Sequence, residues 1–483
     1  MIGTKIKILF ITILVLVLEV PISVFAQDNA VKKGDVLTIE KCIDIAISKN
    51  PNINLAENTT KIYKSRIGQV KSNYFPQMTV GSGYSRQNSI TSFGADNDDN
   101  QYSGNVALNQ LIYDFGKTPS KVKIQNYNLS SSNLDVDNTV IQIAYNVKQA
   151  YYSALSAKIS KDIYAQAIYQ YEQHLKQAKA FYSVGTKSKI DVTTADVNLS
   201  NARLNYIKAN DSYKTAISNL NNVMGIPDAP EYSISDTVTF KNPWNKPEYM
   251  VNISNQTPIK KNDKNLSNKN IKNSNSVLKS NVTKYDVVEN LTFKKFEITL
   301  EDALKKAYAN RPDLKSLVLK ESAAAESIKL ARKDYYPAVS GFANYGFGGR
   351  DFPLDNGWSF GANVNIPVFN GFLTKSQVDE AKANLEIAKS NIEIQKQNIY
   401  LQVEQSYINL TESEKRIPVA QVIVKQAKEN LELANGRYTV GIGNSIEVQD
   451  AEINYNNAQL AYVQAFYDYN TARSTLEKAM GIK

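Results

Sequence analysis

The chain has 483 residues, a formal net charge of +9, one cysteine (Cys42) and one histidine (His174). These counts exclude a disulfide within the chain and leave His174 without partners for a catalytic triad or a zinc site, so we expect it on a helix surface or between helices. With no P-loop or dinucleotide fingerprint either, we expect no enzyme, no cofactor and no metal. Much of the positive charge falls in one lysine-rich segment, so we expect no nucleic acid partner.

Residues 1–26 are predicted to be a secretory signal peptide. Two lysines, Lys5 and Lys7, precede an apolar stretch at 8–18, and Val24-Phe25-Ala26 offers a small-residue cleavage site. The apolar stretch is too short for a membrane-spanning helix. We therefore expect export from the cytoplasm and removal of this segment.

Residues 27–227 are predicted to form a first structural repeat that opens with helices and continues with strands. Thr38 precedes a helical pattern with an acid in its first turn, and Asn50-Pro51 breaks this helix and starts another. After Pro76, apolar and polar residues alternate, which predicts two strands of about 10 to 11 residues, the length that a tilted strand needs to cross a bilayer. The alternation alone also fits a solvated antiparallel sheet on a core.

A very long helix is predicted next, from about residue 117 to 182. Its apolar residues recur at seven-residue spacing, at Val122, Leu129, Val136, Ile143, Ala150 and Ala157. This period predicts left-handed coiled-coil packing, over roughly 65 residues or about 100 Å. Val184-Gly185 then marks a turn in which glycine supplies a positive φ, and a return helix is expected over about 189–224.

Residues 228–297 are predicted to link the first repeat to a second. Within this segment, residues 251–285 consist largely of asparagine, lysine and serine. Such a composition cannot bury enough apolar surface to fold alone, so we expect a loose insertion around the middle of the molecule.

Residues 298–483 are predicted to be the second repeat, offset from the first by about 256 to 261 residues. Thr299, Arg311-Pro312 and Pro337 return in the same order. A second long helix is expected from about 373 to 437, with a kink or an interruption at Pro418. Its seven-residue stripe consists of Val378, Leu385, Ile392 and Ile399. The glycine turn follows at Val440-Gly441, and the return helix is expected over about 445–480.

Four membrane-length strands in one chain cannot close a barrel, because two edges would leave backbone groups unpaired in lipid. Three chains would supply twelve strands, an even number within the known range of membrane barrels. The long helices would continue from these strands as a second, helical tube.

Paired motifs in duplicate extend this interpretation to a family. The proline breaks are Asn50-Pro51 and Arg311-Pro312. The strand pairs open at Tyr74-Phe75-Pro76 and Tyr335-Tyr336-Pro337, and they close at Tyr113-Asp114-Phe115-Gly116 and Phe369-Asn370-Gly371. The turn motifs are Tyr182-Ser183-Val184-Gly185-Thr186 with Ile190-Asp191-Val192 in the first repeat, and Tyr438-Thr439-Val440-Gly441 with Ile446-Glu447-Val448 in the second. In this order the whole mature chain resembles the TolC-type outer-membrane efflux and secretion channels.

The resemblance implies a mainly α fold with membrane β: a duplicated unit, with a long α-helical coiled-coil barrel and four β-strands per chain in a 12-stranded trimeric β-barrel. It implies a homotrimer in contact with outer-membrane lipid, with a long periplasmic extension. Such a channel-tunnel is a passive exit duct for a tripartite efflux pump or a type I protein secretion system. Its implied partners are a periplasmic adaptor (membrane fusion) protein and an inner-membrane pump or ABC transporter.

The resemblance also assigns candidate gate residues. Asp191 and Tyr438 match a network that closes the periplasmic end, and Glu447 and Asp450 match acidic rings around the pore. Rings of like charge in a constriction favour cation passage. For Glu447 and Asp450 the alternative is that they are ordinary acids at a helix N-terminus, which complement the helix dipole.

Two further features of the tip follow from the same comparison. The glycine turns, Val184 with Gly185 and Val440 with Gly441, match the positions that meet the adaptor, although glycine turns also simply end helices. Where the best-known family member has an arginine in its closing network, this chain has Gly443, and the equivalent position in the first repeat is Lys187. We therefore expect the closed state to be looser or held differently.

An alternative from another class is a secreted periplasmic coiled-coil adaptor or scaffold protein without a pore. Adaptors usually have one helical hairpin and β-rich lipoyl-like segments, whereas this sequence predicts two hairpins and membrane-length strands. Recovery of the protein in the soluble periplasm, and not in the outer membrane, would favour the alternative.

Overall fold

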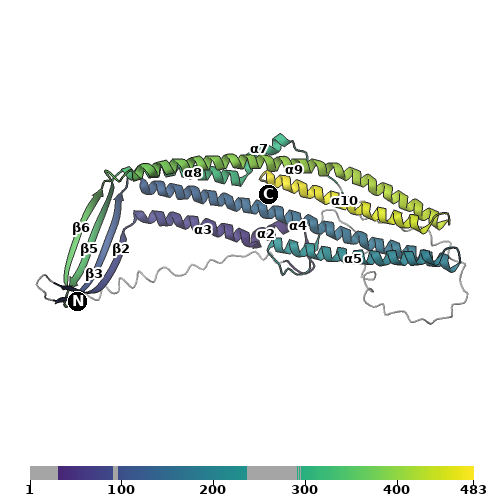
Figure 1. Cartoon of the computed structure of the whole chain (residues 1–483), viewed down its shortest axis with the longest axis horizontal. Helices are drawn as coiled ribbons and strands as arrows, with labels where there is room; N and C mark the ends of the chain where they lie inside the picture. The colour runs from purple at the N-terminus through teal and green to yellow at the C-terminus, as the bar shows by residue number, and fades with distance from the viewer. Residues whose placement is uncertain (1–30, 91–95, 236–290, 292, 294) are drawn as a thin grey trace.

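The computed structural model describes residues 31–90, 96–235, 291, 293 and 295–483. It shows an elongated molecule with a sheet at one end and long helices over the rest (Figure 1). The predicted signal peptide at 1–26 and the insertion at 251–285 lie outside the described residues. No helix in the described part of the chain is long and apolar enough to cross a membrane.

The same order of elements occurs twice, which confirms the predicted duplicated unit. A short parallel sheet of β1 (Val36–Leu37) and β4 (Ser233–Ile234) accompanies the first copy. The first copy consists of α2 (Ile39–Lys49), α3 (Pro51–Lys71), η1 (Ser72–Tyr74), β2 (Gln77–Ile90), β3 (Asp96–Tyr113), α4 (Lys117–Ser183) and α5 (Lys189–Met224). The second consists of α7 (Leu300–Asn310), α8 (Pro312–Arg332), η2 (Lys333–Tyr335), β5 (Ala338–Gly349), β6 (Asp355–Asn365), α9 (Leu373–Thr439) and α10 (Ser445–Ala479).

The proline breaks anchor the ends of the return helices. The Asn50 side chain donates to the carbonyl oxygen of Val223 at 2.7 Å, at the end of α5, and its own oxygen caps α3. In the second copy, Arg311 donates to the carbonyl oxygen of Ala479, at the end of α10. A Cβ at Gly225 would lie 2.9 Å from the backbone of Asn50, so glycine permits this close approach. Each break therefore joins one end of a helical hairpin to its own repeat; the first hairpin is α4 with α5, and the second is α9 with α10.

The two long helices have nearly the predicted bounds, and their seven-residue stripes are buried or half-buried in the helical bundle. Of the kink or interruption predicted at Pro418, the interruption is wrong, because α9 continues through this residue. A proline removes one backbone hydrogen bond from a helix. In α9 the neighbouring turns pack against α10 along the hairpin, and Ile417 and Ala420 are buried beside the proline.

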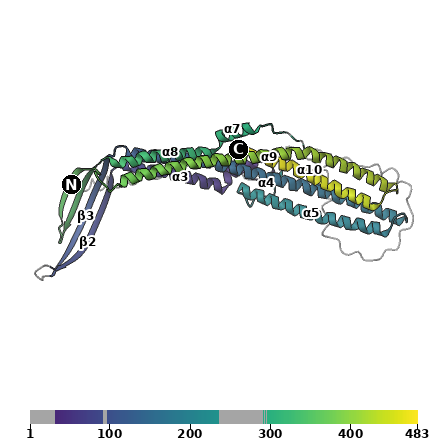
Figure 2. The same cartoon turned by 45° about the horizontal axis from the view of Figure 1, so that its top comes forward.

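The helices form a wall in a fixed order, best followed in Figures 1 and 2. Helix α4 lies at the centre and packs against α3 and α5 on one side and against α8 and α10 on the other. Helix α9 packs against α8 and α10 and forms the outer edge of the second copy. The two edges of the wall are therefore α3 with α5, and α9.

The sheet has the order β2-β3-β5-β6, all neighbours antiparallel, so the strands of the two halves pair side by side. Cross-strand pairs such as Met78 with Leu108 and Tyr345 with Trp358 place apolar residues on one face. The opposite face carries Asn344 opposite Ser359. The two unpaired edges are β2 and β6, which adjoin α3 and α9 in sequence.

The first two strands are longer than predicted. β2 has 14 residues and β3 has 18, whereas β5 and β6 have 12 and 11. The ladder between β2 and β3 continues to the pair Ile90 and Asp96. Ladder bonds join backbone groups, so a hairpin can extend beyond the stretch in which apolar and polar side chains alternate.

Candidate functional site

The candidate site is the end of the helical wall farthest from the sheet, where two turns lie together (Figure 1). Gly185 follows α4 with a φ of +78°, and Gly441 follows α9 with a φ of +84°. In each turn the glycine amide donates to the carbonyl oxygen of a tyrosine three residues earlier, Tyr182 or Tyr438. Nothing lies within 4 Å of a Cβ built at either glycine, so the positive φ, and not a lack of space, requires glycine.

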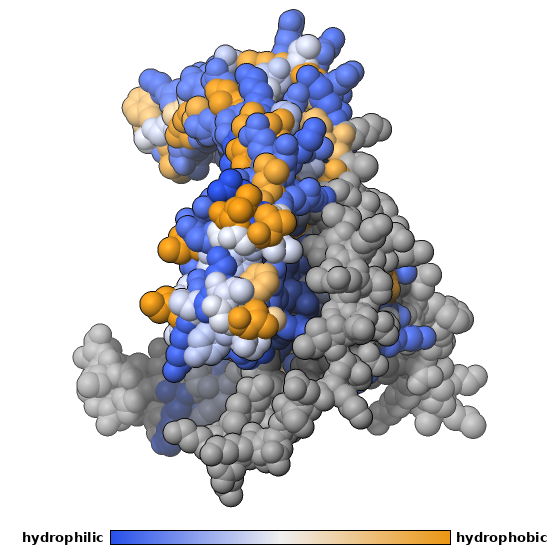
Figure 3. All heavy atoms as spheres, turned by 90° about the vertical axis from the view of Figure 1, so that its right-hand side faces the viewer, coloured by the Kyte–Doolittle hydropathy of each residue, from blue (hydrophilic) through white to orange (hydrophobic). Residues whose placement is uncertain are grey.

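The tip presents apolar side chains to solvent. Val184 and Val440, which share this position in the two repeats, are each 70% exposed in the single chain. Ile190, Ile442 and Ile446 are exposed beside them. Seen from this end of the molecule, hydrophobic residues lie among hydrophilic ones on the described surface (Figure 3). Exposed apolar residues gathered at one place are typical of a surface that meets a partner.

The predicted acidic residues lie in the first turns of the return helices. Asp191 forms a capping box with Ser188, accepting from its backbone nitrogen at 3.0 Å and from its hydroxyl at 2.9 Å. Glu447 occupies the same place in α10, where Asn444 caps its backbone nitrogen at 2.8 Å. Asp450 is exposed one turn later. Asp191 therefore has a local helix-capping role, which the sequence had not predicted for it.

Tyr438, near the end of α9, is 0% exposed and is the centre of the tip. Its ring lies 5.3 Å from that of His174 and 5.6 Å from that of Phe181, both on α4. Burial, and secondarily the charge of Asp191, raises the pKa of Tyr438. Its hydroxyl has no hydrogen-bond partner within the described part of the chain. The structure thus brings Tyr438 near Asp191 without a hydrogen bond between them.

Two cations at the tip were not predicted as site residues. Lys187 donates from Nζ to the carbonyl oxygen of Gly443 at 3.0 Å and lies 5.1 Å from the Tyr438 ring centroid. Arg437 pairs with Glu447, with Nε 3.3 Å from Oε2. The tip therefore has cationic links although position 443 is glycine. The repeat offset that aligns Lys187 with Gly443 was the available signal in the sequence.

His174 is buried between helices and faces a second ionisable group. Its Nδ1 lies 3.7 Å from Oε2 of Glu452 on α10, and the two side chains are 4% and 3% exposed. Neither imidazole nitrogen, nor this carboxylate oxygen, has a hydrogen-bond partner among the described residues. Tyr171 lies beside them, and its pKa is raised by burial and then by Glu452. The pair lies where α4 of the first hairpin packs on α10 of the second.

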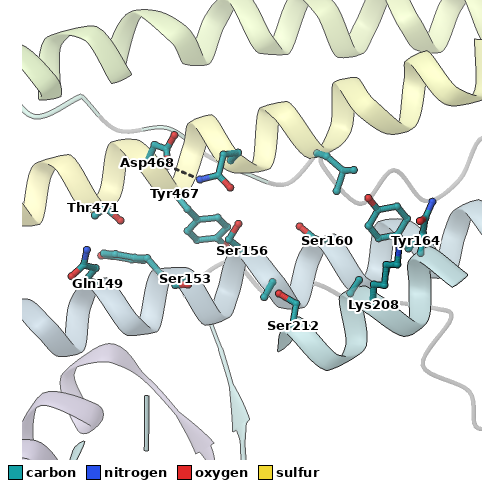
Figure 4. A pocket seen from close by; sticks show the side chains of 16 residues that line it. Gln149, Ser153, Ser156, Ser160, Tyr164, Lys208, Ser212, Tyr467, Asp468 and Thr471 are labelled. Carbon is teal, nitrogen blue, oxygen red and sulfur yellow. Dashed lines mark hydrogen bonds between the residues drawn. The ribbon is translucent and has the colours of Figure 1, made fainter. Parts of the chain in front are cut away.

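A separate groove of about 580 Å³ lies between α4, α5 and α10 (Figure 4). Serine and tyrosine side chains such as Ser156, Ser160 and Tyr164 line it. Its one carboxylate, Asp468, already accepts from Gln464 at 2.6 Å and pairs with Arg416 at 3.2 Å. None of the eight predicted site residues is in the lining, so this groove does not belong to the candidate site.

Comparison with known proteins places this architecture. Residues 42–226 and 303–482 match the family described as outer membrane efflux protein. Over 92% of the chain and 82% of the relative, the sequence is 20% identical to the probable efflux pump outer membrane protein TtgC of Pseudomonas putida. The fold is similar to that of the CmeC outer membrane channel of Campylobacter jejuni, with a TM-score of 0.67 and 18% identity over 92% of this chain and 85% of that one. It is also similar to that of CusC, with a TM-score of 0.69 and 16% identity over 92% of each chain.

Proposed function

This chain belongs to the outer membrane efflux protein family, and we propose that three copies form a passive exit duct across the outer membrane and periplasm. The duct serves a tripartite efflux pump or a type I secretion system. A periplasmic adaptor and an inner-membrane pump or ABC transporter complete that assembly and supply the energy. Family membership favours this duct over the adaptor or scaffold that the sequence left as an alternative.

The observation that carries the proposal is a sheet with one exposed apolar face, joined directly to long helical hairpins. Met78, Val80, Trp358, Phe360 and Val364 are all exposed in the single chain. Aromatic residues gather where the strands meet the helices, and Phe115 stacks on Tyr336 at 5.6 Å. An apolar band bordered by aromatic residues suits a lipid bilayer and its interface.

Three copies follow from the edges of the sheet and of the helical wall. β2 and β6 have unpaired edges, which lipid does not tolerate. The edge of α9 carries an exposed stripe at seven-residue spacing, Ile387, Ile394, Leu401 and Ile408, and the opposite edge carries Leu55 and Ile62 on α3 and Ile190, Val197 and Leu204 on α5. Because the two edges differ, head-to-tail contacts close a ring, and three copies give twelve strands.

We assign the gate and the adaptor contact to the tip. Tyr438, packed against His174 and Phe181, holds the two hairpins of one protomer together, and Asp191 stabilises α5 beside it. Glu447 and Asp450 face the pore as rings of three carboxylates each. The exposed turns at Val184, Gly185, Val440 and Gly441 meet the adaptor. The exposure of the valines and the contacts of Tyr438 support this assignment.

Reconstitution into a planar lipid bilayer tests the proposed function. The purified trimer should form ion-conducting pores, and its conductance should rise when the tip opens. A correctly assembled trimer that never conducts, even after the hairpin turns have been removed, would contradict the duct.

Neutralising the acidic rings should lower the preference of the pore for cations. We expect Asp450→Asn to reduce the cation-to-anion permeability ratio by roughly twofold or more, because three carboxylates are lost from one constriction. Glu447→Gln should have a smaller effect, since Arg437 already neutralises part of that charge. The reversal potential in a salt gradient measures both changes. Glu57→Gln, an exposed acid on α3, is the matched control, and unchanged selectivity in Asp450→Asn would remove this residue from the pore.

A further inference from the structure

One lysine of the first hairpin binds two groups of the second. Nζ of Lys187 donates to the carbonyl oxygen of Gly443 at 3.0 Å and lies 5.1 Å from the centroid of the Tyr438 ring. An ammonium group is attracted both by a carbonyl oxygen and by the face of an aromatic ring. Tyr438 is thereby enclosed by three side chains of the first hairpin: Lys187, His174 and Phe181.

The glycine at position 443 has a steric reason. A Cβ there would lie 2.9 Å from the backbone nitrogen of Tyr438 and 3.0 Å from the carbonyl carbon and Cβ of Arg437. The amide of Gly443 also donates to the carbonyl oxygen of Arg437 at 2.9 Å, which closes the turn tightly. An arginine at 443 would force this turn open. A cationic side chain therefore does not fit at position 443, and the carbonyl oxygen of Gly443 instead accepts from Lys187 of the first hairpin.

Lys187 and Gly443 are the same position in the two repeats, 256 residues apart. In this chain the first repeat provides the cation, Lys187, and the second repeat provides the acceptor, the carbonyl oxygen of Gly443. The surroundings are not symmetric either, because Tyr182, which corresponds to Tyr438, is exposed. The contact consequently exists in one direction only.

We propose that Lys187 is the positioning residue that latches the two hairpins of a protomer in the closed tip. This inference rests on the proposed function, because a latch has a purpose only if the tip opens. When the hairpins separate, Tyr438 and the Gly443 carbonyl move away from Lys187, so both contacts are lost in the open state. Closure is therefore maintained without a cation at position 443.

The test measures the distance between the hairpins and the opening of the pore separately. Spin labels at Val184→Cys and Val440→Cys, in one protomer diluted into unlabelled trimers, report the distance between the turns. The native Cys42 should not react, because it is buried and burial raises its pKa to about 12. K187M removes the charge and keeps the aliphatic stem, K187R restores a cation, and K189M removes an exposed charge nearby.

We expect K187M to lengthen and broaden the distance distribution and to raise the ratio of open to closed channels on the order of tenfold, which corresponds to about 1.4 kcal/mol. K187R and K189M should resemble the wild type. Distances and open ratios unchanged in K187M would overturn the latch, as would equal loosening in K189M. If the trimer never conducts, even after the hairpin turns have been removed, the duct is contradicted, whereas the distance measurement still decides on the latch.

Discussion

Leu401→Asp is expected to abolish the trimer while the protomer keeps its helical fold. Leu401 belongs to the exposed stripe on α9 and is 50% exposed in the single chain, so aspartate costs the isolated protomer little. In the proposed ring the same side chain would be covered by the next copy. An unpaired carboxylate buried there costs several kcal/mol, and it occurs at three equivalent interfaces. Light scattering after size-exclusion chromatography in detergent measures the oligomer, and circular dichroism measures the helix content.

Two matched variants sharpen this result. Leu401→Met keeps an apolar side chain and should stay trimeric. Leu55→Asp puts the same charge on the opposite edge, on α3, and should disrupt the trimer in the same way if the two edges meet. A stable trimer of Leu401→Asp would show that the α9 edge is not the interface.

Charged residues beside the exposed stripe of α9 explain why its role in contacting another copy is hard to recognise in the sequence. Three ion pairs recur at seven-residue spacing along α9, namely Asp379 with Lys382, Glu386 with Lys389 and Glu393 with Lys396. They share the period of the buried stripe and of the exposed stripe. A sequence period therefore predicts that the helix packs, but not which of two apolar faces packs within the chain and which remains for another copy.

Helix ends were predictable because their signals are local. α5 has the predicted bounds, 189–224, since Ser188 caps its start and Gly225 takes a positive φ at its end. The order of the strands was not predictable in this way. The pairing of β3 with β5 joins the two repeats, and no local pattern specifies a contact between residues so far apart in the chain.

At the tip, too, local features could be predicted from the sequence and contacts between distant segments could not. The capping roles of Asp191 and Asn444 follow from helix N-termini, which a sequence reveals. The contact of Lys187 with Gly443 and that of His174 with Glu452 each join two hairpins. Their partners are set by how α4 packs on the second hairpin, so composition alone predicted His174 only as a residue on a helix surface or between helices.

Glu452→Met should destabilise the protein by about 1–3 kcal/mol, because it leaves the buried imidazole of His174 without the carboxylate that faces it. Urea unfolding of the detergent-solubilised protein measures the loss.

The double variant His174→Leu with Glu452→Met separates the ion pair from the packing. Replacing a buried pair by apolar side chains of similar volume is often neutral or stabilising, so this variant should recover the stability lost in Glu452→Met. A Glu452→Met protein as stable as the wild type would show that the pair contributes nothing to the packing of α4 on α10. Because the pair joins α4 to α10 beside the buried Tyr438, its loss should also loosen the contact between the two hairpins near the tip.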